Sequence, residues 1–312
     1  MKHVKLLSLR NFSDEQMAKL NAAAKVTAYR ENVAGYDENE IIARLEGADI
    51  ALVNPSAPVS KQALAARPGL RFIVSSTMGI NHIDLAACRE AGVRVRWFPG
   101  YCARTLAEHA FAMILMGLHF MIPAIDNVRA KRWDYLDFRA RETPGRRLLI
   151  LGLGQSGSHV KQFAEAFGME VSWTNSKTPA TEVDALIARA DVISMHMALN
   201  DGTRQFMDRR RLNLMKPGVV LVNTARGAMV EEDALWEFME RNPGATAFLD
   251  VLEHEPPAPD HRLYRLKNVV VTPHMAWHSE EGAAFLWRAI FEALMLAIKD
   301  EWPASDETAG WL

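Results

Sequence analysis

The sequence predicts an α/β fold made of two doubly wound parallel-sheet domains. Two observations support this prediction: short apolar segments alternate with helical segments along most of the chain, and the alternation is interrupted once, near residue 100. A length of 312 residues is enough for two domains of ordinary size. Strands that alternate with helices are typical of parallel sheets that are covered by helices on both faces.

The first alternation occupies the first hundred residues. Short, mostly apolar segments indicate strands at Val4–Leu9, Ile50–Val53, Leu70–Val74 and Val93–Trp97. Apolar residues at helical spacing indicate helices at Ser13–Ala24, Glu38–Leu45 and Ser60–Ala66. Ser13 and Ser60 are suited to cap two of these helices, because a serine hydroxyl can accept a hydrogen bond from an N–H group of the first turn.

The second alternation begins after a break at Pro99-Gly100 and a long helix predicted over Thr105–Met121. This helix is apolar nearly all round, so we expect it to be buried. A polar surface connection is predicted at Arg129–Arg147. Strands are predicted next at Leu148–Leu151, Glu170–Trp173, Val192–His196, Val219–Asn223, Ala245–Asp250 and Val269–Thr272, and helices at Ser158–Phe167, Val183–Ala190 and Glu231–Glu240.

The last predicted helix, Glu280–Lys299, is expected to return to the first domain. The predicted domains are therefore residues 1–99 with 278–312, and residues 100–277.

Composition and charge exclude several classes of protein. Hydrophobic residues make up 49% of the chain and charged residues 24%, which excludes disordered and collagen-like chains. The net charge of −2 gives no support for nucleic acid or an anionic membrane as a partner. Two cysteines, Cys88 and Cys102, cannot build a disulfide framework or a four-thiolate metal site, and no metal is predicted. Without a signal-peptide core, and with no apolar stretch near the ~20 residues of a membrane span, we expect a soluble, cytoplasmic protein.

A glycine-rich motif, Gly152-Leu153-Gly154-Gln155-Ser156-Gly157, directly follows one predicted strand and opens a helical segment. Glycines here let the chain turn tightly and bring backbone N–H groups close to a pyrophosphate, and the helix N-terminus favours negative charge. The motif alone is weak, and an ordinary glycine-rich turn is the alternative. Its position between a strand and a helix predicts dinucleotide binding by Gly152, Gly154, Gln155, Ser156 and Gly157.

The acidic residue that usually ends the next strand is missing, because the chain reads Trp173-Thr174-Asn175-Ser176-Lys177. A carboxylate there would bind the ribose hydroxyls of NAD and repel a 2′-phosphate. Asn175 and Ser176 can instead donate hydrogen bonds to a phosphate, and Lys177 adds a positive charge. We therefore expect NADP to be favoured over NAD, or both to be used. The alternative is a loop that lost its acid without gaining a function.

Four polar residues follow later strands: Arg226, Asp250, Glu255 and His274. The carboxyl ends of parallel strands face the ligand crevice, so these side chains are expected to line one cleft. Each alone has a structural explanation, as a surface arginine, a capping aspartate, a solvated glutamate or a core histidine. For His196, at the end of another strand, a structural or adenine-side role is expected rather than catalysis.

Together these segments resemble the D-isomer-specific 2-hydroxyacid dehydrogenases, a nicotinamide-dependent family. The matching blocks occur in the family's order and are Met78–Asp84, Pro99–Tyr101, Ala107–His109, Gly152–Gly157, Leu214–Gly218, Asn223–Gly227, Asp250–Pro256 and Thr272–His274. The resemblance implies a Rossmann-type cofactor domain inserted in a flavodoxin-like substrate domain. It also implies an active site in the cleft, domain closure and a homodimer.

By this resemblance His274 donates and accepts the proton, Glu255 is its partner, and Arg226 binds the substrate. An imidazole titrates near neutral pH and can serve both directions of the reaction. A neighbouring carboxylate favours its charged form, and a guanidinium offers paired donors to a carboxylate. The backbone N–H groups of Met78 and Gly79 are expected to hold the substrate carboxylate.

The resemblance also implies cofactor contacts by Asp250 with the nicotinamide amide, by Thr224 and Ala225 along the cofactor, and by His274. Gln155 and Ser156 depart from the family, which commonly has a basic residue followed by isoleucine at these two positions.

The substrate is expected to be a small 2-oxo acid such as hydroxypyruvate or glyoxylate. The run Ala276-Trp277-His278-Ser279 is similar to the Ala-Trp-x-Ser run of glycerate dehydrogenases and of the C-terminal-binding transcriptional corepressors. Two alternatives stay open: a nucleotide-sensing regulatory protein on the same fold, and a family member that acts on another acid or an inorganic anion. Glu255, rather than glutamine, argues against the formate dehydrogenase branch.

Overall fold

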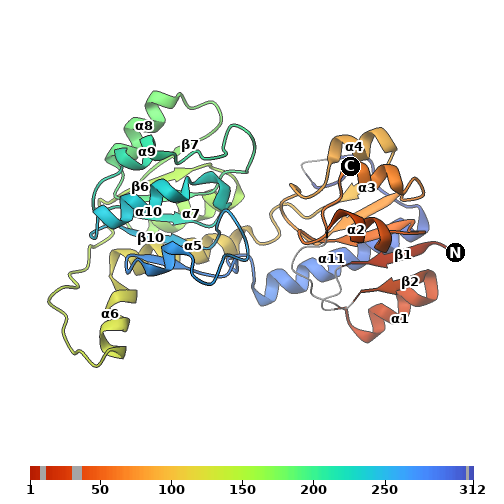
Figure 1. Ribbon diagram of the computed structural model, residues 1–312, viewed down its shortest axis with the longest axis horizontal. Helices are drawn as coiled ribbons and strands as arrows, with labels where there is room; N and C mark the ends of the chain where they lie inside the picture. Colours follow the sequence, from red (N-terminus) through yellow and green to blue (C-terminus); the bar gives the residue numbers. More distant parts are fainter. Residues whose placement is uncertain (8–11, 30–36, 307–308) are drawn as a thin grey trace. The chain divides into compact units, whose positions relative to one another are not determined.

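The computed structural model describes residues 1–7, 12–29, 37–306 and 309–312 and divides the chain into two compact units (Figure 1). Unit 1 consists of Met1–Tyr101 and Ser279–Leu312, and unit 2 consists of Cys102–His278. Each unit is built on one parallel sheet, which confirms the predicted fold class.

Unit 1 has a five-stranded sheet in the order β2-β1-β3-β4-β5, the order of flavodoxin-like folds. Its strands are β1 (His3–Leu6), β2 (Lys25–Ala28), β3 (Ile50–Val53), β4 (Phe72–Ser75) and β5 (Arg94–Arg96). Its helices are α1 (Asp14–Ala23), α2 (Glu38–Arg44), α3 (Lys61–Ala66), α4 (Leu85–Ala91) and α11 (Glu280–Lys299). The hydroxyls of Ser13 and Ser60 accept hydrogen bonds from the N–H groups of Gln16 and Ala63, as predicted for caps.

Two elements of unit 1, β2 and α4, were not predicted from the sequence, and residues 8 and 9 of the strand predicted at Val4–Leu9 lie outside the described residues. β2 is an edge strand with no buried residue, so it lacks the apolar run that identifies the central strands.

The last helix of the chain completes the core of unit 1. Leu286, Ile290 and Leu294 of α11 are buried in one cluster with Leu52 and Phe72 of the sheet. Helices α2, α3 and α4 contribute to the cluster on the opposite face. The two ends of the chain therefore fold as one unit.

Unit 2 has a six-stranded parallel sheet in the order β11-β10-β9-β8-β6-β7. Its strands are β6 (Arg147–Leu151), β7 (Glu170–Thr174), β8 (Val192–Met195), β9 (Val220–Asn223), β10 (Thr246–Leu249) and β11 (Val269–Val271). Its helices are α5 (Ala103–Leu118), α6 (Met121–Arg129), α7 (Gln155–Ala166), α8 (Ala180–Arg189), α9 (Arg209–Leu214) and α10 (Glu232–Arg241). Strand order reverses at β6, since β7 and β8 lie on its two sides, and a ligand crevice is expected at the carboxyl ends beside such a switch point.

Helix α5 is buried against this sheet, as its apolar sequence predicted. Ala110, Ile114 and Leu118 lie in a core cluster with residues of β6, β8, β9 and β10. The predicted end of the helix Thr105–Met121 is wrong, since α5 ends at Leu118. Phe120 adopts the left-handed conformation, and α6 begins after a bend of 66°. Within the described part of the chain no single helix is long and apolar enough to cross a membrane, and only this bent pair passes that test together, by length and composition alone.

Replacing Gly117 of α5 by alanine should destabilise unit 2. The new Cβ would lie 2.7 Å from Val220 Cγ1 and 3.0 Å from Phe248 Cε2. We expect Gly117→Ala to lower the free energy of unfolding by about 1–3 kcal/mol, measured by urea denaturation, because overpacking forces the helix away from the sheet. Gly244→Ala is the control, since its Cβ would meet only Pro217 O at 3.6 Å. Equal stability of the two variants would contradict this account of the packing.

Candidate active site

The glycine-rich turn lies where β6 meets α7. Gly152 adopts a φ of +95°, and a Cβ there would lie 2.8 Å from the backbone nitrogen of Met197. A Cβ on Gly157 would lie 2.4 Å from the carbonyl oxygen of Gly152. Gly154 precedes α7 without a side-chain cap, so backbone N–H groups of the first turn remain for a ligand. This donor set suits the phosphates of a dinucleotide.

A buried histidine directly after β8 contacts this turn. His196 Nδ1 is 3.2 Å from the Ser156 hydroxyl, and Nε2 is 2.8 Å from the Ser194 hydroxyl. Burial lowers the pKa of His196 to about 4, so the ring is neutral near pH 7. His196 therefore connects β8 to the first turn of α7 through two neutral hydrogen bonds.

The loop that follows β7 holds its polar residues at the surface. The Asn175 side-chain oxygen accepts a hydrogen bond of 2.8 Å from the N–H of Lys177, and the Asn175 N–H donates to the Thr178 hydroxyl at 3.0 Å. These bonds fix the backbone of the turn, while the side chains of Ser176 and Lys177 are exposed. Since β7 lies beside β6, this loop is next to the glycine-rich turn in the sheet order.

The segment after β9 is held by one buried side chain. The Asn223 oxygen accepts a hydrogen bond of 3.0 Å from the N–H of Ala225, and its nitrogen donates to the carbonyl of Arg226 at 3.0 Å. Thr224 is also buried, and its hydroxyl has no hydrogen-bond partner among the described residues. An unpartnered buried hydroxyl is costly, so this atom fits a polar group of a bound cofactor.

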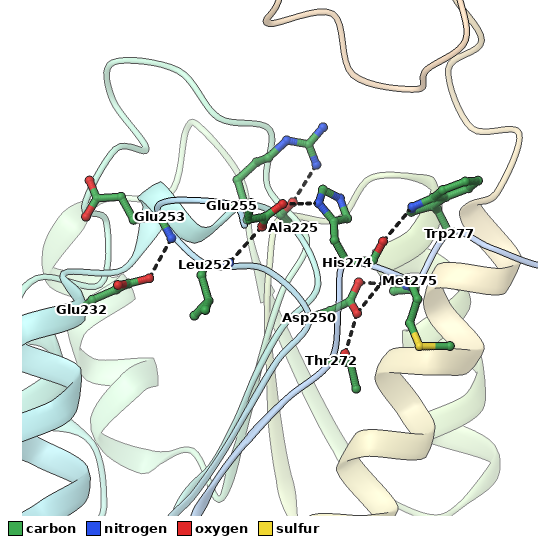
Figure 2. A network of polar contacts seen from close by, with 12 residues as sticks. Ala225, Glu232, Asp250, Leu252, Glu253, Glu255, Thr272, His274, Met275 and Trp277 are labelled. Atoms are coloured by element: carbon green, nitrogen blue, oxygen red, sulfur yellow. Dashed lines mark hydrogen bonds and ion pairs between the residues drawn. The ribbon is translucent and has the colours of Figure 1, made fainter. Parts of the chain in front are cut away.

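Glu255 and His274 form the central polar contact of unit 2. The Glu255 Oε2 atom is 2.6 Å from His274 Nδ1, and Figure 2 shows the two side chains facing each other. The other carboxylate oxygen accepts a hydrogen bond from the N–H of Leu252 at 2.9 Å. Burial raises the pKa of the Glu255 carboxyl, but His274, this N–H and Arg226 outweigh burial and hold the pKa below its ordinary value.

Because Nδ1 of His274 contacts Glu255, the other ring nitrogen is Nε2, and it makes no hydrogen bond to any described residue. The His274 side chain is 40% exposed, so Nε2 is accessible to a small molecule. Arg226 is half-buried and donates from Nη1 to the Ala225 carbonyl at 2.7 Å. Burial lowers the pKa of its guanidinium, and the negative charge of Glu255 opposes that shift.

His274 is held in a strained conformation by Asp250. Its φ is +51°, a left-handed value that costs a non-glycine residue about 1–3 kcal/mol. The buried Asp250 carboxylate accepts hydrogen bonds from the Thr272 hydroxyl at 2.5 Å and from the N–H of Met275 at 2.9 Å (Figure 2). It also accepts one from the N–H of Ala276 at 2.8 Å. The His274 N–H donates to the Asp250 carbonyl at 2.9 Å. Asp250 therefore positions the loop of His274, and its expected contact with the nicotinamide amide stays a prediction.

A second close approach brings the loops of Arg226 and Glu255 together. A Cβ on Gly227 would lie 1.9 Å from the carbonyl carbon of Leu252 and 2.3 Å from the nitrogen of Glu253. The Glu253 N–H also donates to the Glu232 carboxylate of α10 at 2.7 Å. Only glycine allows this contact, so Gly227 fixes the spacing between the two loops.

Met78 and Gly79 belong to unit 1, in the half-buried loop after β4. The Thr77 hydroxyl donates to the Gly79 carbonyl at 2.7 Å and is 2.7 Å from the Ser75 hydroxyl. These bonds give the loop a defined backbone. The other predicted site residues all lie in unit 2, at the carboxyl ends of its strands.

Several supporting residues were not among the predicted site residues: Asn223, Gly227, Thr272 and Ser194. His109 of α5 is a further one, since its Nε2 lies 3.9 Å from Asp250 Oδ1 and has no hydrogen-bond partner among the described residues. Asn223, Gly227, Thr272 and His109 lie within the motif blocks, and this position is the sequence signal that could have identified them. Ser194 lies inside a strand, and nothing in its sequence context marks it.

The lowered pKa of Glu255 predicts a pH-dependent contribution to stability. The unfolded carboxyl binds a proton at higher pH than the folded one, so stability rises with pH across this interval. The contribution is present above the unfolded pKa of ~4.3 and is lost as the pH falls through the folded pKa. We therefore expect Glu255→Gln to be less stable than the wild type at pH 6, with the difference in thermal midpoint vanishing toward pH 3. A difference that grows on acidification would contradict the assigned direction.

Comparison with known proteins places the chain in one family. A model of the D-isomer specific 2-hydroxyacid dehydrogenase NAD binding domain matches residues 111–276. The chain is 31% identical to the hydroxypyruvate reductase of Thermotoga maritima, over 79% of this chain and 83% of that protein. It is 30% identical to the glycerate dehydrogenase of Methylorubrum extorquens, over 83% of this chain and 85% of that protein.

Two solved structures share the fold across nearly the whole chain. D-lactate dehydrogenase from Aquifex aeolicus, complexed with NAD and lactic acid, has a TM-score of 0.82 and 28% identity, covering 95% of this chain and 96% of that one. An acyclic imino acid reductase in complex with NADPH and D-Arg has a TM-score of 0.85 and 26% identity, covering 96% and 98%. The protein is therefore an oxidoreductase of the D-isomer specific 2-hydroxyacid dehydrogenase family, as its motifs predicted, and unit 2 contains the NAD-binding domain.

Proposed function

We propose that the protein transfers a hydride between NAD(P)H and a small 2-oxo acid and so forms a D-2-hydroxy acid. The observation that carries this proposal is the 2.6 Å contact between Glu255 Oε2 and His274 Nδ1, with His274 Nε2 left accessible. An acid–base pair of this kind at the carboxyl ends of the strands of an NAD-binding domain suits carbonyl reduction.

His274 is assigned the proton transfer. When bound, the nicotinamide supplies a hydride to the carbonyl carbon, and the proton on His274 Nε2 goes to the carbonyl oxygen. Glu255 holds the ring through Nδ1, so that Nε2 is the nitrogen that exchanges the proton. Its negative charge stabilises the imidazolium that precedes reduction. In the reverse direction the neutral ring accepts the proton from the hydroxyl group.

Arg226 is assigned to the substrate. A guanidinium presents paired N–H donors that match a carboxylate or a polarised carbonyl, and its half-burial strengthens the interaction. The hydrogen bond from Asn223 to the Arg226 carbonyl and the packing of Gly227 hold the backbone from which this side chain extends. Met78 and Gly79 are assigned to the substrate carboxylate through their backbone N–H groups, on a loop that Thr77 stabilises.

Hydroxypyruvate and glyoxylate are the proposed substrates. The relatives from Thermotoga maritima and Methylorubrum extorquens are named for hydroxypyruvate and glycerate, which differ by one reduction step. The test follows the oxidation of NADPH and NADH separately against hydroxypyruvate, glyoxylate, pyruvate and a phenyl oxo acid. Fastest turnover of one of the first two supports the assignment. Tight cofactor binding without turnover of any acid would favour a nucleotide-sensing role instead.

Replacing the proposed proton donor should abolish turnover without removing cofactor binding. We expect His274→Ala to lower kcat by about 10²–10⁴-fold, the range for loss of a general acid. The dissociation constant for the cofactor, measured by fluorescence titration, should change by less than threefold. His254→Ala is the control, because His254 is an exposed loop residue. Near wild-type turnover of His274→Ala would remove it from the mechanism.

We further propose that NADP(H) is favoured, because the loop Asn175–Lys177 presents amide, hydroxyl and ammonium donors without a carboxylate. Asn175→Asp keeps the side-chain oxygen that accepts from the Lys177 N–H but adds a negative charge. It should raise KM for NADPH at least tenfold while leaving KM for NADH unchanged or lower, because a carboxylate repels a 2′-phosphate. Lys177→Ala should also raise KM for NADPH without raising KM for NADH. A wild-type preference for NADH would refute the proposal.

A homodimer is proposed as the assembly. Large apolar side chains are exposed on α6 and on the segment after it, and they are Met121, Ile125, Val128, Trp133, Tyr135 and Leu136. Exposed apolar patches of this kind mark association surfaces. We expect the wild type to have twice the monomer mass in light scattering, and the combined change Trp133→Ser and Leu136→Ser to give monomers. An unchanged mass would place the interface elsewhere.

A further inference from the structure

We propose that the hydrogen-bonded series Ser194–His196–Ser156 directs the hydroxyl proton of Ser156 toward the pyrophosphate of the bound dinucleotide. His196 is then a positioning residue for cofactor binding. This inference rests on the proposed use of NAD(P)H. The protein atoms that orient the Ser156 hydroxyl are those of His196 and Ser194.

The three side chains connect the sheet to the glycine-rich turn. Ser194 is completely buried within β8, His196 follows the end of that strand, and Ser156 lies in the first turn of α7. The Ser194 hydroxyl is 2.8 Å from Nε2 of His196, and the Ser156 hydroxyl is 3.2 Å from Nδ1. Neither hydroxyl has another hydrogen-bond partner in the part of the chain that the structure describes.

Hydrogen-bond satisfaction selects one tautomer of His196. A neutral imidazole has one donor nitrogen and one acceptor nitrogen. If Nε2 carried the proton, it would donate to Ser194, whose own buried proton would then lack an acceptor. If Nδ1 carries the proton, Ser194 donates to Nε2 and is satisfied. Leaving a buried donor unpaired is costly, so the Nδ1–H tautomer is favoured.

This tautomer determines what Ser156 offers to a ligand. The Nδ1–H group donates to the Ser156 oxygen, so the Ser156 proton has no acceptor within the described protein. The residue is partly exposed at the N-terminal turn of α7, where the helix dipole favours an anion. A phosphate oxygen is the acceptor that this site accommodates. Isoleucine, common at this position in the family, cannot provide such a donor.

The tautomer is tested directly by ¹⁵N NMR of protein labelled at histidine, with His196→Asn used to assign the signals. The expected spectrum shows Nδ1 of His196 as the protonated nitrogen and Nε2 as the unprotonated one from pH 6 to 8. A protonated Nε2, or an imidazolium in this range, would overturn the proposal.

The effect on the cofactor is tested by calorimetric binding of NADPH, NADH, ADP and adenosine. Ser156→Ala should weaken the binding of the ligands that carry a pyrophosphate about tenfold and leave the binding of adenosine unchanged. A tenfold change is the loss expected for one hydrogen bond to a charged acceptor. Ser158→Ala, on the same helix, is the matched control and should bind all four like the wild type.

A double-mutant comparison separates positioning from general structural damage. His196→Asn alone should weaken dinucleotide binding. Added to Ser156→Ala, it should raise the dissociation constant less than twofold more, because His196 acts through Ser156. Equal losses in both backgrounds would overturn the proposed route. If the wild type bound no dinucleotide, the proposed function itself would fail; binding that is intact in Ser156→Ala would refute this inference alone.

Discussion

The buried carboxylate of Asp250 is the interaction on which the site depends. A charge that is 1% exposed is tolerated only when hydrogen bonds replace its lost hydration, and three donors from Thr272, Met275 and Ala276 do so. Those donors all belong to the loop of His274. The requirement to satisfy one buried charge therefore holds His274 at a positive φ, which in turn sets its contact with Glu255.

Hydrogen-bonding groups in unit 2 divide into two kinds. Asp250 and Asn223 are satisfied within the protein, and they hold loops in place. Thr224 Oγ1, His274 Nε2 and the Ser156 proton have no partner among the described residues, and all three lie near the carboxyl ends of the strands. Unsatisfied groups are costly in an interior unless a ligand completes them, which is why they indicate where cofactor and substrate bind.

Much of the fold was predictable because it follows from local patterns. The caps at Ser13 and Ser60, the helix Glu280–Lys299 and the strand Ile50–Val53 match the structure, since capping and apolar runs are properties of adjacent residues. The helices α4, α6 and α9 and the edge strand β2 were missed, because short or exposed elements have weak periodicity. For the site, the sequence predicted that Arg226, Glu255 and His274 each follow a strand, and the structure places them after β9, β10 and β11, which are neighbours in the sheet.

By itself, the sequence determined the alternation of strands and helices, the glycine-rich turn, the missing acid at Asn175 and the family to which the chain belongs. These features depend on residue identity and on spacing along the chain. Only the tertiary structure decided that Asp250 supports the loop of His274, that Gly227 packs on Leu252, and that His196 joins Ser194 to Ser156. Each of these contacts joins segments from different strands, and its geometry arises only when the sheet brings their carboxyl ends together.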